Sequence, residues 1–182
     1  MLFAIIVDYD GDVRWKRSAA GMRDSLAQTA QRAKVGTDEL YRDTKQRHLE
    51  LEDLIRGGTG PTGRGTGPTE WSRTCERTPL MQRLEVGGQQ QLPQQLASEA
   101  EFKKHVAEII HEAELVAVIA EVMLQEEMED ADDDDYRAYS EAMRDAAREI
   151  TDAVQRDDYE SARKAVGAVK NSCVACHEIY RA

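Results

Sequence analysis

Aromatic residues and prolines are scarce in this chain of 182 residues, which is 5% aromatic and contains four prolines. Runs of β-branched residues are also few, whereas Glu, Ala, Arg and Gln are abundant. Helix propensity therefore outweighs strand propensity along most of the chain. The hydrophobic fraction of 41% is enough to build a core, so we expect one bundle-sized helical domain with an extension.

Positive charge is in deficit, since 24 Lys and Arg stand against 35 Asp and Glu, for a formal net charge of −11. A surface of this sign repels phosphates, so we expect no nucleic-acid partner and expect a basic protein partner instead. Much of the excess lies in residues 126–135, which predict a solvated loop between helices. A docking patch or a metal-binding loop are the alternatives, although the run lacks the Gly and the terminal Glu of an EF-hand loop.

A long apolar run is missing at the N-terminus. Residues 1–7 are apolar, but Asp8 and Asp10 follow at once, without a basic segment or a small-residue cleavage site. As it stands, the segment is neither a complete signal peptide nor a membrane span. It is either a short apolar end or buried strand, or the remnant of an export or anchor segment that starts further upstream.

Glycine and proline mark one boundary in the chain. Residues 57–77 contain a near-repeat of Gly-Thr-Gly-Pro-Thr, which cannot continue a helix and predicts a flexible linker. Before it, residues 1–56 form an N-terminal segment in which apolar residues recur at helical spacing, with an interruption near Gly36. This pattern predicts an amphipathic helix pair that acts either as a spacer or as a packed unit.

Residues 78–182 contain four segments with helical periodicity. The expected helices cover about 79–96, 98–128, 133–155 and 158 to the end. The first is interrupted by Gly87-Gly88 and Pro93, and the second begins with a capping box at Ser98. Helices joined by short polar loops pack as antiparallel neighbours. The expected fold class is therefore all-α, an antiparallel four-helix bundle with an N-terminal helical extension.

The last predicted helix contains the pentapeptide Cys173-Val174-Ala175-Cys176-His177, which has the C-x-x-C-H pattern of c-type haem attachment. Positions i, i+3 and i+4 of a helix share one face, so two thioethers can hold a porphyrin beside an imidazole that binds iron. Two of the three cysteines and one of the four histidines fall in this pentapeptide. We predict one covalent haem c, held by Cys173 and Cys176, with His177 as the proximal ligand.

Other cysteine sites fit the sequence less well. A redox-active C-x-x-C pair requires a βαβ setting, which the sequence does not predict, and a zinc site requires a second metal-spaced pair. Thioether-bound haem is attached on the outer side of the bacterial energy-transducing membrane. We therefore expect export to the periplasm or an equivalent compartment. Cys75 is left as an unpaired thiol, which is either idle or used for an intermolecular disulfide or a lipid.

The position of the motif resembles that in one known family. A haem motif inside the last helix, followed by Tyr180-Arg181, resembles the cytochrome c′ family, whereas class I cytochromes c carry the motif near the N-terminus. The resemblance covers about residues 78–182 and is strongest in the last helix. It implies a four-helix bundle with haem between the helices near one end. It also implies that Tyr180 and Arg181 pack against the haem or approach its propionates; core packing is the alternative for Tyr180.

The same resemblance implies that the first helix of the bundle decides the sixth position of the iron. Met81 is the candidate ligand, and an ordinary core methionine is the alternative. A His/Met site suits the function that we expect, electron transfer, whereas an apolar distal pocket would suit an NO or CO sensor or scavenger. We see no distal His or Arg pair for peroxidase chemistry, so we do not expect an enzyme. The N-terminal helices would tether the bundle to a membrane or pair two copies of the chain.

Overall fold

The computed structural model describes residues 1–60 and 67–180, and within these ranges all regular structure is helical, which confirms the predicted fold class. The chain divides into two compact units, Met1–Cys75 and Glu76–Ala182. The helices are α1 (Leu2–Asp8), α2 (Lys16–Arg32), α3 (Asp38–Ile55), α4 (Trp71–Thr74), α5 (Arg77–Leu84), the π-helix η1 (Glu85–Gln91), α6 (Leu92–Gln95), α7 (Glu99–Lys104), α8 (Val106–Met123), α9 (Asp134–Gln155) and α10 (Tyr159–Tyr180).

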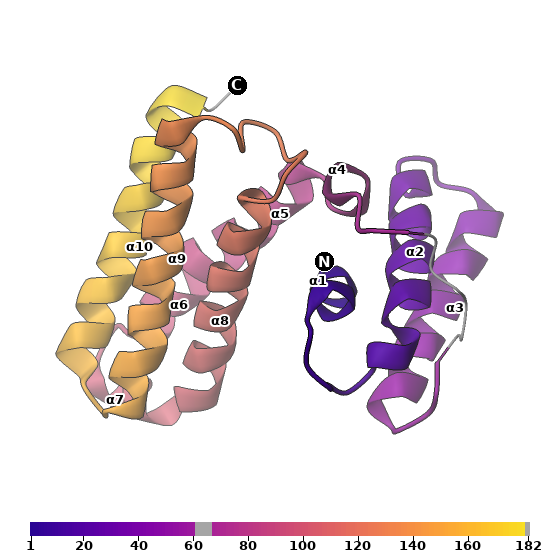
Figure 1. The fold of residues 1–182 in the computed structure, drawn as a ribbon. Helices are drawn as coiled ribbons and strands as arrows, with labels where there is room; N and C mark the ends of the chain where they lie inside the picture. The colour runs from indigo at the N-terminus through magenta and orange to yellow at the C-terminus, as the bar shows by residue number, and fades with distance from the viewer. Residues whose placement is uncertain (61–66, 181–182) are drawn as a thin grey trace. The chain divides into compact units, whose positions relative to one another are not determined.

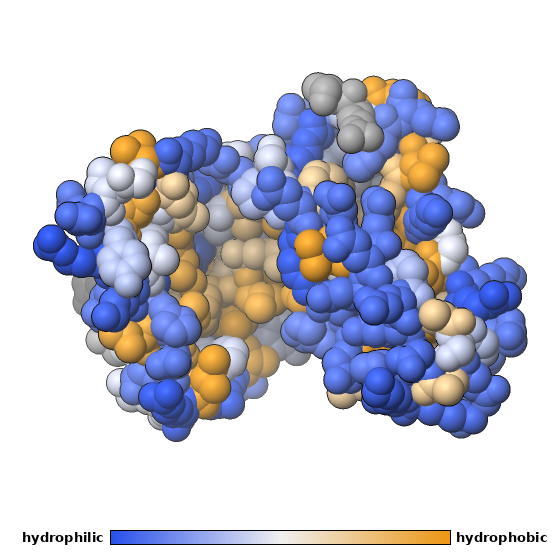
Figure 2. Space-filling model, turned by 180° about the vertical axis from the view of Figure 1, so that it is seen from behind, coloured by the Kyte–Doolittle hydropathy of each residue, from blue (hydrophilic) through white to orange (hydrophobic). Residues whose placement is uncertain are grey.

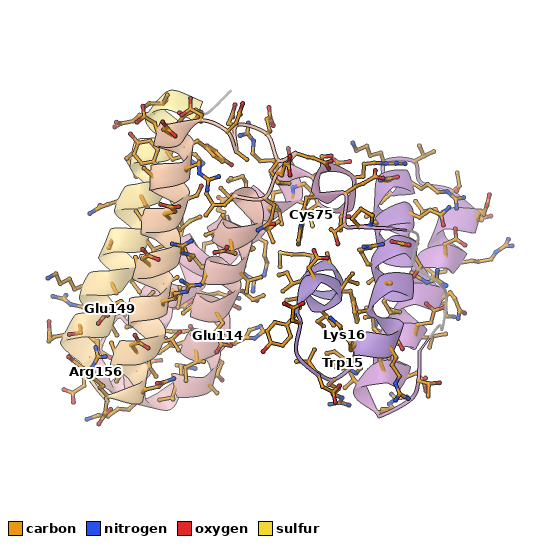
Figure 3. The ribbon with its side chains drawn as sticks, in the orientation of Figure 1. Trp15, Lys16, Cys75, Glu114, Glu149 and Arg156 are labelled. Atoms are coloured by element: carbon orange, nitrogen blue, oxygen red, sulfur yellow. The ribbon has the colours of Figure 1, made fainter. Side chains whose placement is uncertain are left out.

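The first unit is held together where α2 begins. The apolar N-terminal run is the helix α1, so the strand that we considered for it is wrong. The Lys16 ammonium donates to the carbonyls of Ile6 and Val7 at 2.9 and 3.1 Å, and the Trp15 indole donates to the carbonyl of Leu54 at 3.1 Å (Figure 3). These donors satisfy carbonyls at the C-terminal ends of α1 and α3, which have no partner within their own helices.

The ends of the glycine-rich segment lie against α2. The Ser18 hydroxyl donates to the carbonyl of Thr59, and the buried Arg23 guanidinium donates to Thr69 Oγ1 at 3.0 Å. Trp71 of the short helix α4 and the Cys75 thiol that follows it are also buried. Both flanks of the predicted linker therefore pack within the first unit. Residues 61–66 of that linker lie outside the described residues.

The second unit is a helical bundle. Helices α8, α9 and α10 run side by side, and the α5–η1–α6 segment packs against α8 and α10 (Figure 1). Ser98 caps α7 by accepting from the Glu101 amide at 3.2 Å, as the capping box predicts. The single helix expected over 98–128 is wrong in two places, because it breaks at His105 and ends at Met123. The fully buried core includes Phe102, Ile109, Ile119, Tyr136, Ile150 and Val169.

The interruption predicted at Gly87-Gly88 takes the form of a π-helix. The chain continues as a helix from α5 through η1 into α6, with i→i+5 geometry over seven residues. A Cβ built on Gly88 would lie 3.7 Å from both Val116 and Val169, so the backbone of η1 closely approaches α8 and α10. The glycine pair therefore lies inside a continuous helical segment and does not end it.

Hydrophilic residues cover most of the face shown in Figure 2. In residues 1–60 and 67–180, no helix combines the length and the apolar character that a membrane crossing requires. These observations agree with the mean hydropathy of −0.64.

Candidate haem site

The pentapeptide lies in the last two turns of α10. Cys173 and His177 are half-buried, and Cys176 is only 8% exposed. Neither cysteine forms a disulfide. Burial raises the pKa of both thiols. The helical spacing places all three side chains on one side of α10.

One face of α9 lies against this pentapeptide. Met143 Sδ is 3.8 Å from Cys173 Sγ. Tyr136 and Ser140 are 1% exposed and lie seven and three residues before Met143, which puts the three side chains on one side of the helix. The hydroxyl oxygen of Ser140 is buried and has no hydrogen-bond partner in the described residues. The Tyr136 hydroxyl is also buried, and the positive charge of Arg77 acts on it. An unsatisfied buried hydroxyl costs about 1–3 kcal/mol, so this face has unused capacity to bind a polar group.

The C-terminal end of α10 is fixed to the start of α9 by a tyrosine pair. The rings of Tyr136 and Tyr180 meet edge to face, with centroids 5.3 Å apart and planes at 76°. The Tyr180 hydroxyl donates to Asp133 Oδ1 at 2.5 Å. This bond raises the pKa of Tyr180 and lowers that of Asp133. Asp133 also caps α9 by accepting from the Tyr136 amide at 3.1 Å, so one carboxylate orients both helix ends.

Arg77 brings the first helix of the bundle to the same end. Its guanidinium pairs with Asp130 at 2.6 Å and with Glu129 at 2.9 Å, and lies 5.6 Å from the centre of the Tyr136 ring. Burial raises the pKa of the Cys176 thiol, and the positive charge of Arg77 opposes that rise. Sequence analysis missed Arg77, because nothing in its local sequence indicates that it faces the acidic loop and the haem motif.

Met81 lies on the same side of the first helix as Arg77. It is half-buried and follows Arg77 by four residues, which is one helical turn. Further along the segment, Gly88 packs against Val169 of α10. Since the charge of Arg77 acts on Cys176 and Gly88 lies near Val169, Met81 falls between these two levels along α10. Arg181, the other residue singled out for this end, lies outside the described residues.

The residues present fit a covalently attached porphyrin better than a protein-bound metal ion. Two thiols outside any disulfide and an imidazole share one helix face, and the buried Ser140 hydroxyl on α9 has no hydrogen-bond partner among residues 1–60 and 67–180. Among residues 1–60 and 67–180, no cluster of three or more His, Cys, Asp or Glu side chains is arranged to hold a metal ion. The metal-binding alternative for residues 126–135 therefore finds no support in the described part of the loop.

The helical fold and the C-x-x-C-H pentapeptide in the last helix are those expected of a c-type haem cytochrome. Residues 131–181 match the family model described as "Cytochrome C'", which confirms the resemblance drawn from the sequence. The matched segment contains α9 and α10 with the whole pentapeptide, and it is in these two helices that the chain is similar to cytochrome c′. Searches of curated proteins and of solved structures found no match.

Proposed function

We propose that Cys173 and Cys176 bind one haem through thioether bonds and that His177 binds its iron. Each thiol S–H adds across a haem vinyl group: sulfur bonds to one vinyl carbon, and hydrogen goes to the other. No oxidant is consumed. The observation that carries this proposal is that the two free thiols and the imidazole share one face of α10, next to the face of α9 on which Met143 contacts Cys173.

We further propose that the protein transfers electrons. When bound, the haem supplies a one-electron couple at its iron. The chain's own residues surround it with low-polarity groups, because Met143, Val166 and Val169 are buried beside the motif. Two thioethers would hold such a group on α10, and Asp133 ties the end of that helix to the start of α9. Attachment of this kind also supports our proposal that the protein is exported to the periplasm.

The test is expression of the wild-type chain with and without an added export signal, in cells that attach haem to c-type cytochromes. We expect the exported protein to retain haem after denaturation, by intact mass and by in-gel haem staining, and to undergo reversible one-electron reduction. The protein retained in the cytoplasm should stay free of haem. Exported protein that lacks haem after denaturation would rule out the proposed attachment.

The acidic loop supports a basic redox partner. Glu126, Glu127, Asp132, Asp134 and Asp135 are exposed, and the bond from Tyr180 to Asp133 shows that this loop lies beside the end of α10. Carboxylates at that place would attract a positively charged partner to the haem end of the bundle.

We expect the rate of electron transfer to a small basic cytochrome to fall as ionic strength rises, because salt screens exposed charges. Replacing Asp134 and Asp135 by Asn should lower the rate at low salt. Glu149→Gln is the matched control, since Glu149 lies about 21 Å further along α9 and pairs with Arg156 (Figure 3). Equal losses in the two variants would argue against docking at the loop.

A further inference from the structure

A buried carboxylate connects α8 to the first helical segment of the bundle. Glu112 of α8 is 6% exposed. Arg83 Nη2 lies 2.8 Å from its Oε1 and 2.7 Å from its Oε2. The Gln91 amide nitrogen, in the orientation that satisfies both groups, donates to the same two oxygens at 2.9 and 3.1 Å. The carboxylate is therefore paired and hydrogen-bonded, as a buried charge must be to be tolerated.

The backbone of η1 forms the wall of this site. A Cβ on Gly87 would lie 2.4 Å from Glu112 Oε2 and 2.6 Å from Arg83 Nη1. A larger residue at this position would displace the Glu112 carboxylate and the Arg83 guanidinium from their places against the helix backbone. Arg83, Gly87 and Gln91 follow one another at intervals of four residues, so one carboxylate contacts three successive levels of the α5–η1 segment.

The same segment carries Met81, two residues before Arg83. Further along the segment, Gly88 of η1 packs against Val116 of α8 and Val169 of α10. Val169 precedes Cys173 by one helical turn. The contacts of Glu112 therefore tie the α5–η1 segment to α8, and Gly88 brings the same segment against α10, the helix that carries the pentapeptide.

We infer that Glu112 is a positioning residue for the sixth side of the haem: through Arg83, Gly87 and Gln91 it holds the α5–η1 segment in the register that presents Met81 to the iron. This inference rests on the proposed haem attachment and on Met81 as the sixth ligand. A buried ion pair contributes little to stability compared with apolar residues of similar volume, which leaves specification of register as its role.

The test is the double variant Glu112→Leu/Arg83→Leu, which removes the ion pair between α8 and α5 without leaving an unpaired buried charge. The matched control is Glu121→Leu/Arg144→Leu, because Glu121 also lies on α8 and its 3.1 Å ion pair reaches α9 instead of α5. Glu114→Gln, at an exposed position of α8, controls for the loss of a negative charge (Figure 3). All variants are prepared as exported holoprotein, and circular dichroism measures their helix content.

We expect the Glu112/Arg83 variant to keep its helix content and covalent haem, to lose low-spin character and to bind CO about tenfold more tightly in the ferrous state, because the open form is more populated. Hydrogen exchange of the 85–91 amides should accelerate in this variant alone. Glu112→Gln, which keeps hydrogen-bonding atoms in place, should restore part of the low-spin signal. The inference is overturned if the Glu112/Arg83 variant matches the Glu121/Arg144 control in spin state and CO affinity.

The wild-type protein separates failure of this inference from failure of the proposed function. Wild-type protein without covalent haem would refute the proposed attachment. A wild-type protein that holds haem but is already high-spin would overturn the positioning role, because there would be no Met81 ligation to support. Low-spin wild type with an unchanged Glu112/Arg83 variant would overturn the positioning role alone.

Discussion

Replacement of both Cys173 and Cys176 by Ser is expected to abolish covalent haem, from nearly full occupancy to none. A serine hydroxyl is close in size to a thiol but is not acidic enough to add to a vinyl group under physiological conditions. The bundle should still fold, since Cys173 is half-buried and the buried Cys176 changes by a single atom. Intact mass and in-gel haem staining after denaturation measure the loss, and circular dichroism measures the helix content.

Cys75→Ser is the matched control for this loss. Cys75 is also a free, buried cysteine, but it lies in the first compact unit. We expect this variant to retain the full haem content. Single Ser variants at positions 173 and 176 should each keep one thioether. Covalent haem in the double variant, or loss of haem in Cys75→Ser, would show that the attachment site has been assigned to the wrong cysteines.

Met81→Leu is expected to convert a ferrous protein that excludes CO into one that binds it at once. Leucine nearly preserves the volume of methionine but has no sulfur to bind iron. The reduction potential should fall as well, because a thioether ligand favours the ferrous state. Ferrous spectra with and without CO and a potentiometric titration measure both effects.

Two other methionines test whether the ligand has been identified correctly. Met123 of α8 and Met143 of α9 are buried in the same unit, and each is replaced by Leu in turn. Only the Met81 variant should open the site. If the Met123 or Met143 variant binds CO instead, Met81 is not the ligand. If the wild-type protein already binds CO, the iron has an open sixth position, and binding of NO or CO is the better functional interpretation.

The sequence predicted a feature correctly wherever all the residues that determine the feature lie in one helix. The capping box at Ser98 and the helices α9 and α10 follow directly from sequence spacing. The break at His105 was missed, because the apolar period runs through it and only packing decides that the helix bends there. The glycine pair at 87–88 was interpreted as an interruption, since a sequence pattern does not distinguish a helix end from a π-helical turn in close contact with neighbouring helices.

Residues that act across helices were not accessible from the sequence. Arg77, Tyr136 and Glu112 are separated from their partners by long stretches of chain, and the types of residue alone do not indicate such pairs. An isolated Arg in a first helical turn or a Glu in an apolar helix is usually exposed. Only the packing of α5, η1 and α8 shows that Glu112 is buried and that its charge is compensated.

The sequence by itself determined the helical class, the C-x-x-C-H pentapeptide and the resemblance to cytochrome c′, because helix periodicity and the i, i+3, i+4 spacing are properties of a single segment. The tertiary structure decided what surrounds that pentapeptide: the tyrosine pair, Arg77, the level of Met81 and the buried Glu112. The physical reason is that burial, ion pairing and helix register depend on several helices at once. Their free energies are fixed only when the bundle is packed.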